Sequence, residues 1–207
     1  MSTKNVLLVE GKNDEHLLYA LLEHHAVPKN SFRIKDKQGW EKLRRELDVE
    51  IDASDLECLG ILVDTDASLN GRWQALCDIL QKCGYTSIPS QPNALGTIIE
   101  QSGKPRIGVW LMPNNKKSGM LEDFLQMLIP SENVLWAYAQ RCVEELPERL
   151  FSSTHNSKAT TYTYLAWQEQ PGQLFSVAVK ANSFDANAQP AQELISWIQR
   201  LFLLPLL

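Results

Sequence analysis

The chain has 207 residues, of which 44% are hydrophobic and 22% are charged. This composition is close to the globular average, so it excludes a disordered, collagen-like or coiled-coil protein and fits one α/β domain, with or without a small appendage. Lysine and arginine number 20 against 25 aspartates and glutamates, which gives a net charge of −5. That balance argues against a strongly basic nucleic-acid binder, but it is compatible with an acidic site that holds cations.

The cysteines and the apolar runs bear on the compartment. The four cysteines have neither CxxC nor zinc-finger spacing, which indicates reduced, mostly buried thiols. The apolar run at 6–9 is too short for a signal peptide, and the longest run, 201–207, is far shorter than a membrane span. We therefore expect a cytoplasmic protein with no membrane partner.

The first half of the chain alternates short apolar runs with segments of helical spacing. Pro28 and Gly84 close two of these strand–helix units. The expected elements are strands at 6–9, 32–34 and 58–63, and helices from Asn13 to before Pro28, at 39–47 and up to Gly84.

The second half is expected to be richer in helices. Residues 160–167 fit either a helix or a strand, because their β-branched and aromatic side chains suit both. The other expected elements are strands at 85–89, 95–99 and 106–112 and helices at 121–129, 134–146 and 190–202. The pattern predicts an α/β fold with a mostly parallel central sheet flanked by helices on both faces, formed by residues 1–130. A mainly helical extension, 131–207, is expected to pack on this core as one compact unit.

Acidic residues follow three of the predicted strands. Glu10 comes directly after the first, Asp64 and Asp66 after the next buried strand, and Glu122 and Asp123 shortly after a third. Ligands of an open parallel sheet bind beyond the carboxyl ends of its strands. The three groups therefore converge on one site if these strands are neighbours.

The residue types suit a magnesium site. If the extended conformation continues past Val63, Asp64 and Asp66 point the same way, and Mg²⁺ takes one or two such carboxylates. Gly11 leaves room for the close approach of a phosphate. The alternatives are loop or cap chemistry for Asp64 and Asp66, and compensation of the helix dipole for the acids at 122–123.

These residues also carry a family resemblance. Val-Glu-Gly-Lys-Asn-Asp at 9–14, with Val-Asp-Thr-Asp at 63–66, resembles the signature of the TOPRIM fold. That fold is shared by type IA topoisomerases, bacterial primases, small ribonucleases and OLD-family nucleases. Residues 110–124 look like the third block of small stand-alone TOPRIM-like proteins of uncharacterised function, distant relatives of the OLD-family nucleases. The resemblance covers roughly residues 4–130.

The resemblance implies phosphodiester chemistry with Mg²⁺ or Mn²⁺, most simply that of a nuclease or of a nuclease-like component of a larger system. By similarity, Glu10 would be the general acid/base or a metal-linked carboxylate, and Lys158 the basic residue at the scissile phosphate, with Lys116 and Lys117 as further candidates. The implied metal ligands are Asp64, Asp66, Glu122 and Asp123. The implied substrate contacts are Gly11, Lys12, Asn114, Asn115 and Lys116.

Departures from the family pattern narrow the range of functions that the resemblance implies. Ala67 stands where a third carboxylate is common, so one-metal and two-metal chemistry both stay open. No strand-passage gate surrounds the tyrosines, which argues against a topoisomerase. No template-handling module is visible, which argues against a primase. No GxxxxGK[ST] loop is present, so an ATPase would be supplied by a partner chain. DNA and RNA are equally open as substrates, as is the oligomeric state.

Two alternatives belong to other functional classes. One is a catalytically silent binding or regulatory module, because a fold does not guarantee its chemistry. The other is a receiver-like signalling domain in which Asp64 accepts phosphate. Glu10-Gly11 stands where that class has two adjacent acids, and the chain is too long for a bare receiver.

Overall fold

The computed structural model describes residues 4–204, and in this part of the chain five strands form one sheet in the order β2-β1-β3-β5-β4. The strands are β1 (Asn5–Val9), β2 (Arg33–Asp36), β3 (Cys58–Asp64), β4 (Thr97–Ile99) and β5 (Arg106–Met112). β4 pairs antiparallel with β5, and all other pairings are parallel. The predicted α/β class with a mostly parallel sheet is confirmed.

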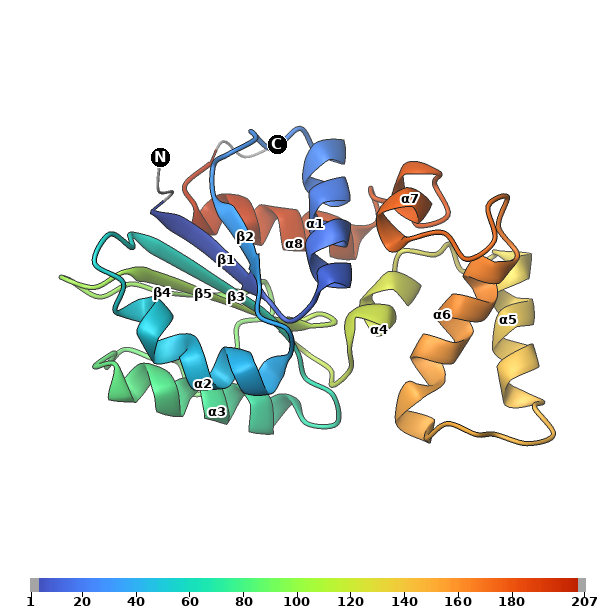
Figure 1. Ribbon diagram of the computed structural model, residues 1–207, viewed down its shortest axis with the longest axis horizontal. Coiled ribbons are helices and arrows are strands. Elements are labelled where there is room, and N and C mark those ends of the chain that lie inside the picture. The colour runs from blue at the N-terminus through green and yellow to red at the C-terminus, as the bar shows by residue number, and fades with distance from the viewer. Residues whose placement is uncertain (1–3, 205–207) are drawn as a thin grey trace.

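Helices cover both faces of the sheet (Figure 1). α2 (Trp40–Ile51) and α3 (Leu69–Lys82) lie on one face, and α1 (Lys12–His24) and α8 (Gln189–Leu201) lie on the other. Successive residues of β1 alternate between the two cores: Leu7 joins the α1–α8 side and Leu8 the α2–α3 side. Because both faces are buried, the inner strands β1, β3 and β5 are largely continuous apolar runs rather than alternating ones.

The chain beyond the sheet is helical. Its elements are α4 (Leu121–Gln126), α5 (Val134–Glu144), the short 3₁₀ turn η1 (Ser153–His155), α6 (Asn156–Ala166), α7 (Phe175–Lys180) and then α8. α5 and α6 pack side by side beyond the carboxyl ends of the strands, and α7 packs on α1 (Figure 1). α8 returns to the sheet, so this segment contributes to the main core. Within the described residues, no helix is long and apolar enough to cross a membrane.

Some predicted elements differ from the observed ones. The strand expected at 85–89 is wrong: Tyr85 is buried and its hydroxyl donates to the Pro105 carbonyl at 2.8 Å, while the backbone N–H of Thr86 donates to the Gln101 side chain at 2.8 Å. These two hydrogen bonds involve side chains and take the place of the backbone hydrogen bonds that would pair residues 85–89 with a neighbouring strand. β2 begins one residue later than expected, at Arg33, which pairs with Val6, and the side chain of the preceding Phe32 stacks on Phe202. Residues 160–167 are mostly helical, within α6, and α7 was not predicted.

Close contact between Gly96 and Trp197 fixes α8 against the sheet. Gly96 has φ +86, and a Cβ there would lie 2.2 Å from Cδ1 of Trp197, whose indole N–H donates to the Thr97 carbonyl at 3.3 Å. We expect Gly96→Ala to lower the free energy of unfolding by about 2–4 kcal/mol, measured by urea denaturation. Gly103→Ala is the control, since Gly103 has φ +76 with no atom within 4 Å of its Cβ position. It is expected to cost only about 1 kcal/mol. Equal losses in the two variants would contradict the role given to the indole ring.

Candidate active site

The carboxyl ends of β1, β3 and β5 lie next to one another, because β3 pairs with both other strands. Glu10 directly follows β1, and Asp64 is the last residue of β3. The backbone N–H of Asp64 donates to Oε1 of Glu10 at 2.9 Å. The two acids expected at neighbouring strand ends are therefore in direct contact.

Asp64 is the most electrostatically strained member of the site. Its Oδ1 is buried and has no hydrogen-bond partner within residues 4–204. Burial, and then the charges of Asp14, Glu10 and Glu122, raise the pKa of Asp64 to about 9. A buried carboxylate among other carboxylates is costly in its ionised form, so the site favours either a proton or a bound cation.

Asp14 belongs to the site, although the sequence indicated only a helix start. It lies in the first turn of α1, and its Oδ2 accepts the backbone N–H of Gly11 at 3.0 Å. Asp14 is only 7% exposed. Burial, followed by the charge of Glu10, raises its pKa to about 7. No local signal in the sequence marked it, because its burial depends on how the start of α1 meets the strand ends.

Glu10 and Glu122 complete a group of four acids with raised pKa values. Burial raises the pKa of Glu10, opposed mainly by the positive charge of Arg72 and by the N–H of Asp64. Glu122, near the start of α4, is 5% exposed. Burial raises its pKa, opposed by its own backbone N–H and then by the charge of Lys158. We call Glu10, Asp14, Asp64 and Glu122 the acidic cluster.

The chain does not stay extended past Asp64, so the geometry that would point Asp66 and Asp64 the same way is not observed, although the charge of Asp66 still acts on Asp64 and Glu10. β3 ends at Asp64, and Asp66 has φ +47. The backbone N–H groups of Thr65 and Asp66 both donate to the Gly119 carbonyl at 2.9 Å, which turns the chain away from the strand direction. The Asp66 side chain is 60% exposed, and its Oδ2 pairs with Nη2 of Arg72 at 2.5 Å. Asp66 is thus the counter-ion of Arg72.

Asp123 and the two asparagines serve the local backbone. Oδ2 of Asp123 accepts the N–H of Met120 at 2.8 Å, and Oδ1 accepts the Ser157 hydroxyl, so Asp123 caps α4 and ties it to α6. Oδ1 of the buried Asn115 accepts the N–H of Leu111 at 2.8 Å. Oδ1 of Asn114 accepts the N–H groups of the two following lysines at 3.2 and 3.1 Å. These contacts shape the loop between β5 and α4.

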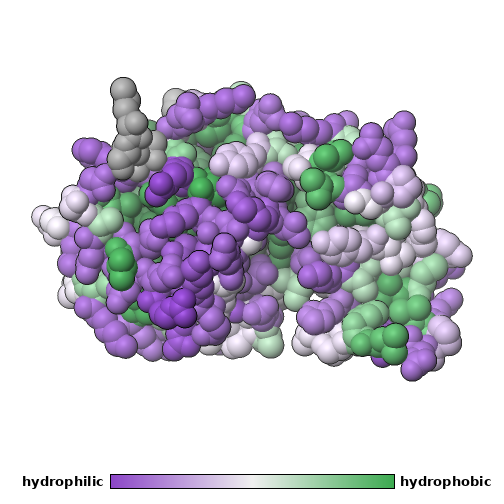
Figure 2. Space-filling model, in the orientation of Figure 1, coloured by the Kyte–Doolittle hydropathy of each residue, from purple (hydrophilic) through white to green (hydrophobic). Residues whose placement is uncertain are grey.

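Of the basic candidates, Lys158 acts on a member of the acidic cluster, while Lys12, Lys116 and Lys117 lie on segments that follow β1 and β5. Lys158, in the first turn of α6, is exposed and acts on Glu122 through its charge. Figure 2 shows a notch at the lower edge, between the part that carries the sheet and the α5–α6 pair. Lys116 and Lys117 are exposed in the β5–α4 loop. Lys12 pairs with Glu15 at 2.5 Å at the start of α1, directly after Gly11.

The donor set of the cluster consists of oxygen atoms, which suits hard cations such as Mg²⁺ and Mn²⁺. Across residues 4–204, no three His, Cys, Asp or Glu side chains are already gathered as a metal-binding group. A divalent ion here would therefore keep several water or phosphate oxygens as ligands, as Mg²⁺ commonly does. The unpartnered Oδ1 of Asp64 is the atom that such an ion would satisfy.

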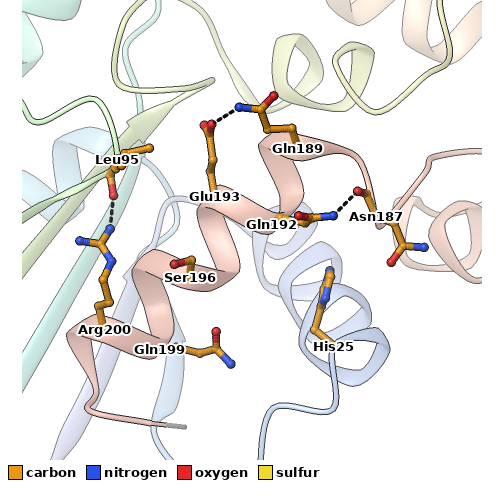
Figure 3. Close-up of a pocket in the computed structure, with 9 residues that line it drawn as sticks. All are labelled: His25, Leu95, Asn187, Gln189, Gln192, Glu193, Ser196, Gln199 and Arg200. Atoms are coloured by element: carbon orange, nitrogen blue, oxygen red, sulfur yellow. Dashed lines mark hydrogen bonds between the residues drawn. The ribbon is translucent and has the colours of Figure 1, made fainter. Parts of the chain in front are cut away.

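A second hollow runs along α8 (Figure 3). It is lined by His25, Leu95 and polar side chains of α8 and of the preceding loop. Gln189 donates to Glu193 at 2.7 Å, and Gln192 to the Asn187 carbonyl at 2.6 Å. Its polar groups largely satisfy one another, and it contains no predicted site residue. The acidic cluster therefore remains the candidate active site.

Comparison with known proteins adds a family assignment. A family model described as "Protein of unknown function (DUF3226)" matches residues 4–203. No curated protein and no solved structure matches the chain. Because the family match spans both the sheet and the C-terminal helices, Lys158 on α6 and the acidic cluster belong to one family unit.

Proposed function

The chain belongs to the DUF3226 family, and we propose that it is a cytoplasmic Mg²⁺- or Mn²⁺-dependent enzyme that cleaves phosphodiester bonds in nucleic acid. The observation that carries this proposal is the buried, unpartnered carboxyl oxygen of Asp64 among three further acids at the carboxyl edge of a parallel sheet. The resemblance of residues 9–14 and 63–66 to the TOPRIM signature supports the same chemistry.

The residues divide into roles by their contacts. Asp64 would hold the ion through its unpartnered Oδ1, with Asp14 and Glu122 binding it directly or through its water ligands, since their charges act on Asp64. When bound, the ion would polarise a phosphate and lower the pKa of an attacking water. Glu10 is fixed by the N–H of Asp64, and burial raises its pKa, which is the direction that suits a carboxyl exchanging a proton with a reacting oxygen. Lys158 would offset charge on the phosphate.

The surroundings of the acidic cluster support a polyanionic substrate. Lys116, Lys117 and Lys158 are exposed on the loop and helix next to it, where a phosphate backbone would bring them into contact. Their charges are local, so they are compatible with an acidic chain overall. A partner chain could supply an ATPase, as the TOPRIM resemblance implies for OLD-type systems.

A cleavage assay tests the proposal. Supercoiled plasmid, linear duplex, single-stranded DNA and RNA are incubated with the protein and Mg²⁺, Mn²⁺ or EDTA. We expect metal-dependent cutting of at least one substrate, reduced by about 10³-fold in Asp64→Asn, because a lost ion ligand removes several kcal/mol of transition-state stabilisation. Asp78→Asn, which removes an exposed acid of α3, is the matched control and should cut normally.

Two results would contradict the proposal. The first is equal cutting by the Asp64→Asn variant, which would point to a contaminating nuclease. The second is the absence of cutting with either metal on every substrate. If nucleic acid then still bound in EDTA, the catalytically silent binding module would be favoured instead.

A further inference from the structure

Arg72 is a buried cation at the edge of the acidic cluster. It lies in α3, one turn after the helix start, and is only 9% exposed. Its guanidinium carbon lies 3.9 Å from the centre of the Trp40 ring, and its Nη2 pairs with Asp66 at 2.5 Å. Its buried Nη1 has no hydrogen-bond partner within the described part of the chain. The guanidinium is therefore held in place, and the N–H groups of Nη1 are left without an acceptor.

The charge of Arg72 acts on Glu10 as well as on Asp66. Among the effects that oppose burial at Glu10, the positive charge of Arg72 is the largest. Glu10 is tied to the end of β3 by its 2.9 Å bond to the N–H of Asp64. The positive charge of the guanidinium thus offsets the charges of two acids, Glu10 after β1 and Asp66 after β3. A second divalent ion bound by Glu10 and Asp66 would have to occupy the position of the Arg72 guanidinium.

We propose that Arg72 takes the position of a second cation, so that each chain binds a single divalent ion at the acidic cluster, with Asp64 as its principal ligand. This inference rests on the proposed metal-dependent function. An arginine stays charged at every accessible pH and repels an incoming cation. Withdrawing Asp66 from it would leave a buried guanidinium without its ion pair, which is unfavourable. Arg72 is on this account a positioning residue that fixes the metal stoichiometry.

Binding of Mn²⁺ tests the inference without any assay of activity. Free Mn²⁺ is measured by electron paramagnetic resonance as the ion is titrated into the protein. We expect one bound ion per chain in the native protein and in Arg72→Lys, which keeps the charge. Arg72→Gln is expected to bind two, because Glu10 and Asp66 are then without a cation. Arg45→Gln removes the same charge from an exposed arginine of α2, 73% accessible, and should bind one.

The possible results separate the inference from the function it rests on. Two ions in the native protein, or one ion in a folded Arg72→Gln variant, would overturn the inference and leave the metal-dependent function standing. No bound ion in the native protein would overturn both. Should Arg72→Gln fail to fold, Asp66→Asn decides: unchanged binding of one ion supports the inference, and loss of the ion overturns it by making Asp66 a ligand.

Discussion

At pH 8 and without metal, Asp64→Asn is expected to raise the free energy of unfolding by about 1–3 kcal/mol. Asparagine keeps the size of the side chain but cannot ionise. The native carboxyl is buried, and Asp14, Glu10 and Glu122 lie close enough to raise its pKa from the usual 3.8 to about 9. The substitution therefore removes a group whose charged form the fold disfavours. Urea denaturation monitored by circular dichroism measures the change.

The pH dependence of this effect has a definite sign. The folded chain holds the Asp64 proton more tightly than the unfolded chain does. The stability from this proton is thus fully present below the ordinary pKa of 3.8 and is lost as the pH rises through about 9. The advantage of Asp64→Asn should therefore be absent at pH 4 and grow up to pH 9. Saturating Mg²⁺ should stabilise the native protein alone, because only it retains the ligand.

Asp66→Asn is the matched control for Asp64→Asn, two residues along the chain. Asp66 is 60% exposed but pairs with the buried Arg72, so its loss is expected to lower the free energy of unfolding by about 1–3 kcal/mol. The two substitutions make the same chemical change with opposite expected signs. A native protein more stable than Asp64→Asn at pH 8 without metal would mean that the Asp64 carboxylate is well partnered in its charged form.

Most of the sheet could be predicted because its strands are buried on both faces. The runs at 6–9 and 58–63 contain no polar side chain, the run at 106–112 contains only Arg106 at its start, and each lies within an observed strand. The segment at 85–89, Tyr-Thr-Ser-Ile-Pro, contains β-branched and aromatic residues but has no strand partner. Its buried tyrosine bonds to the chain before β5, a contact that depends on tertiary structure alone.

The acidic cluster could be predicted only in part. Glu10 and Asp64 follow from the rule that parallel strands end at one edge. The burial of Asp14 depends on how α1 meets the sheet, and no local pattern distinguishes it from an ordinary helix start. Asp66 was misplaced because its backbone conformation is set by the Gly119 carbonyl, far along the chain. Residues whose conformation depends on distant partners were the ones that sequence spacing could not position.

Binding of Mn²⁺ is expected to tighten by about 10-fold or more per pH unit between pH 6 and pH 8, with less change above pH 9. Asp64, with a pKa of about 9, must lose its proton before it can bind an ion, and Asp14, with a pKa of about 7, must do the same at lower pH. Raising the pH removes this competition, so affinity rises. Isothermal titration calorimetry in two buffers of different protonation enthalpy measures both the affinity and the protons released.

The Asp14→Asn variant separates the contributions of Asp14 and Asp64 to the pH dependence of Mn²⁺ affinity. Without the second proton, the affinity should change less steeply below pH 7 while still rising between pH 7 and pH 9. The native protein should release about one proton per ion at pH 8, where Asp64 is still mainly protonated and Asp14 is mainly ionised. An affinity that stays flat from pH 6 to pH 9 would mean that both carboxyls ionise with ordinary pKa values. In that case the surrounding protein would already compensate the negative charges of the acidic cluster, and the cluster would not need a cation.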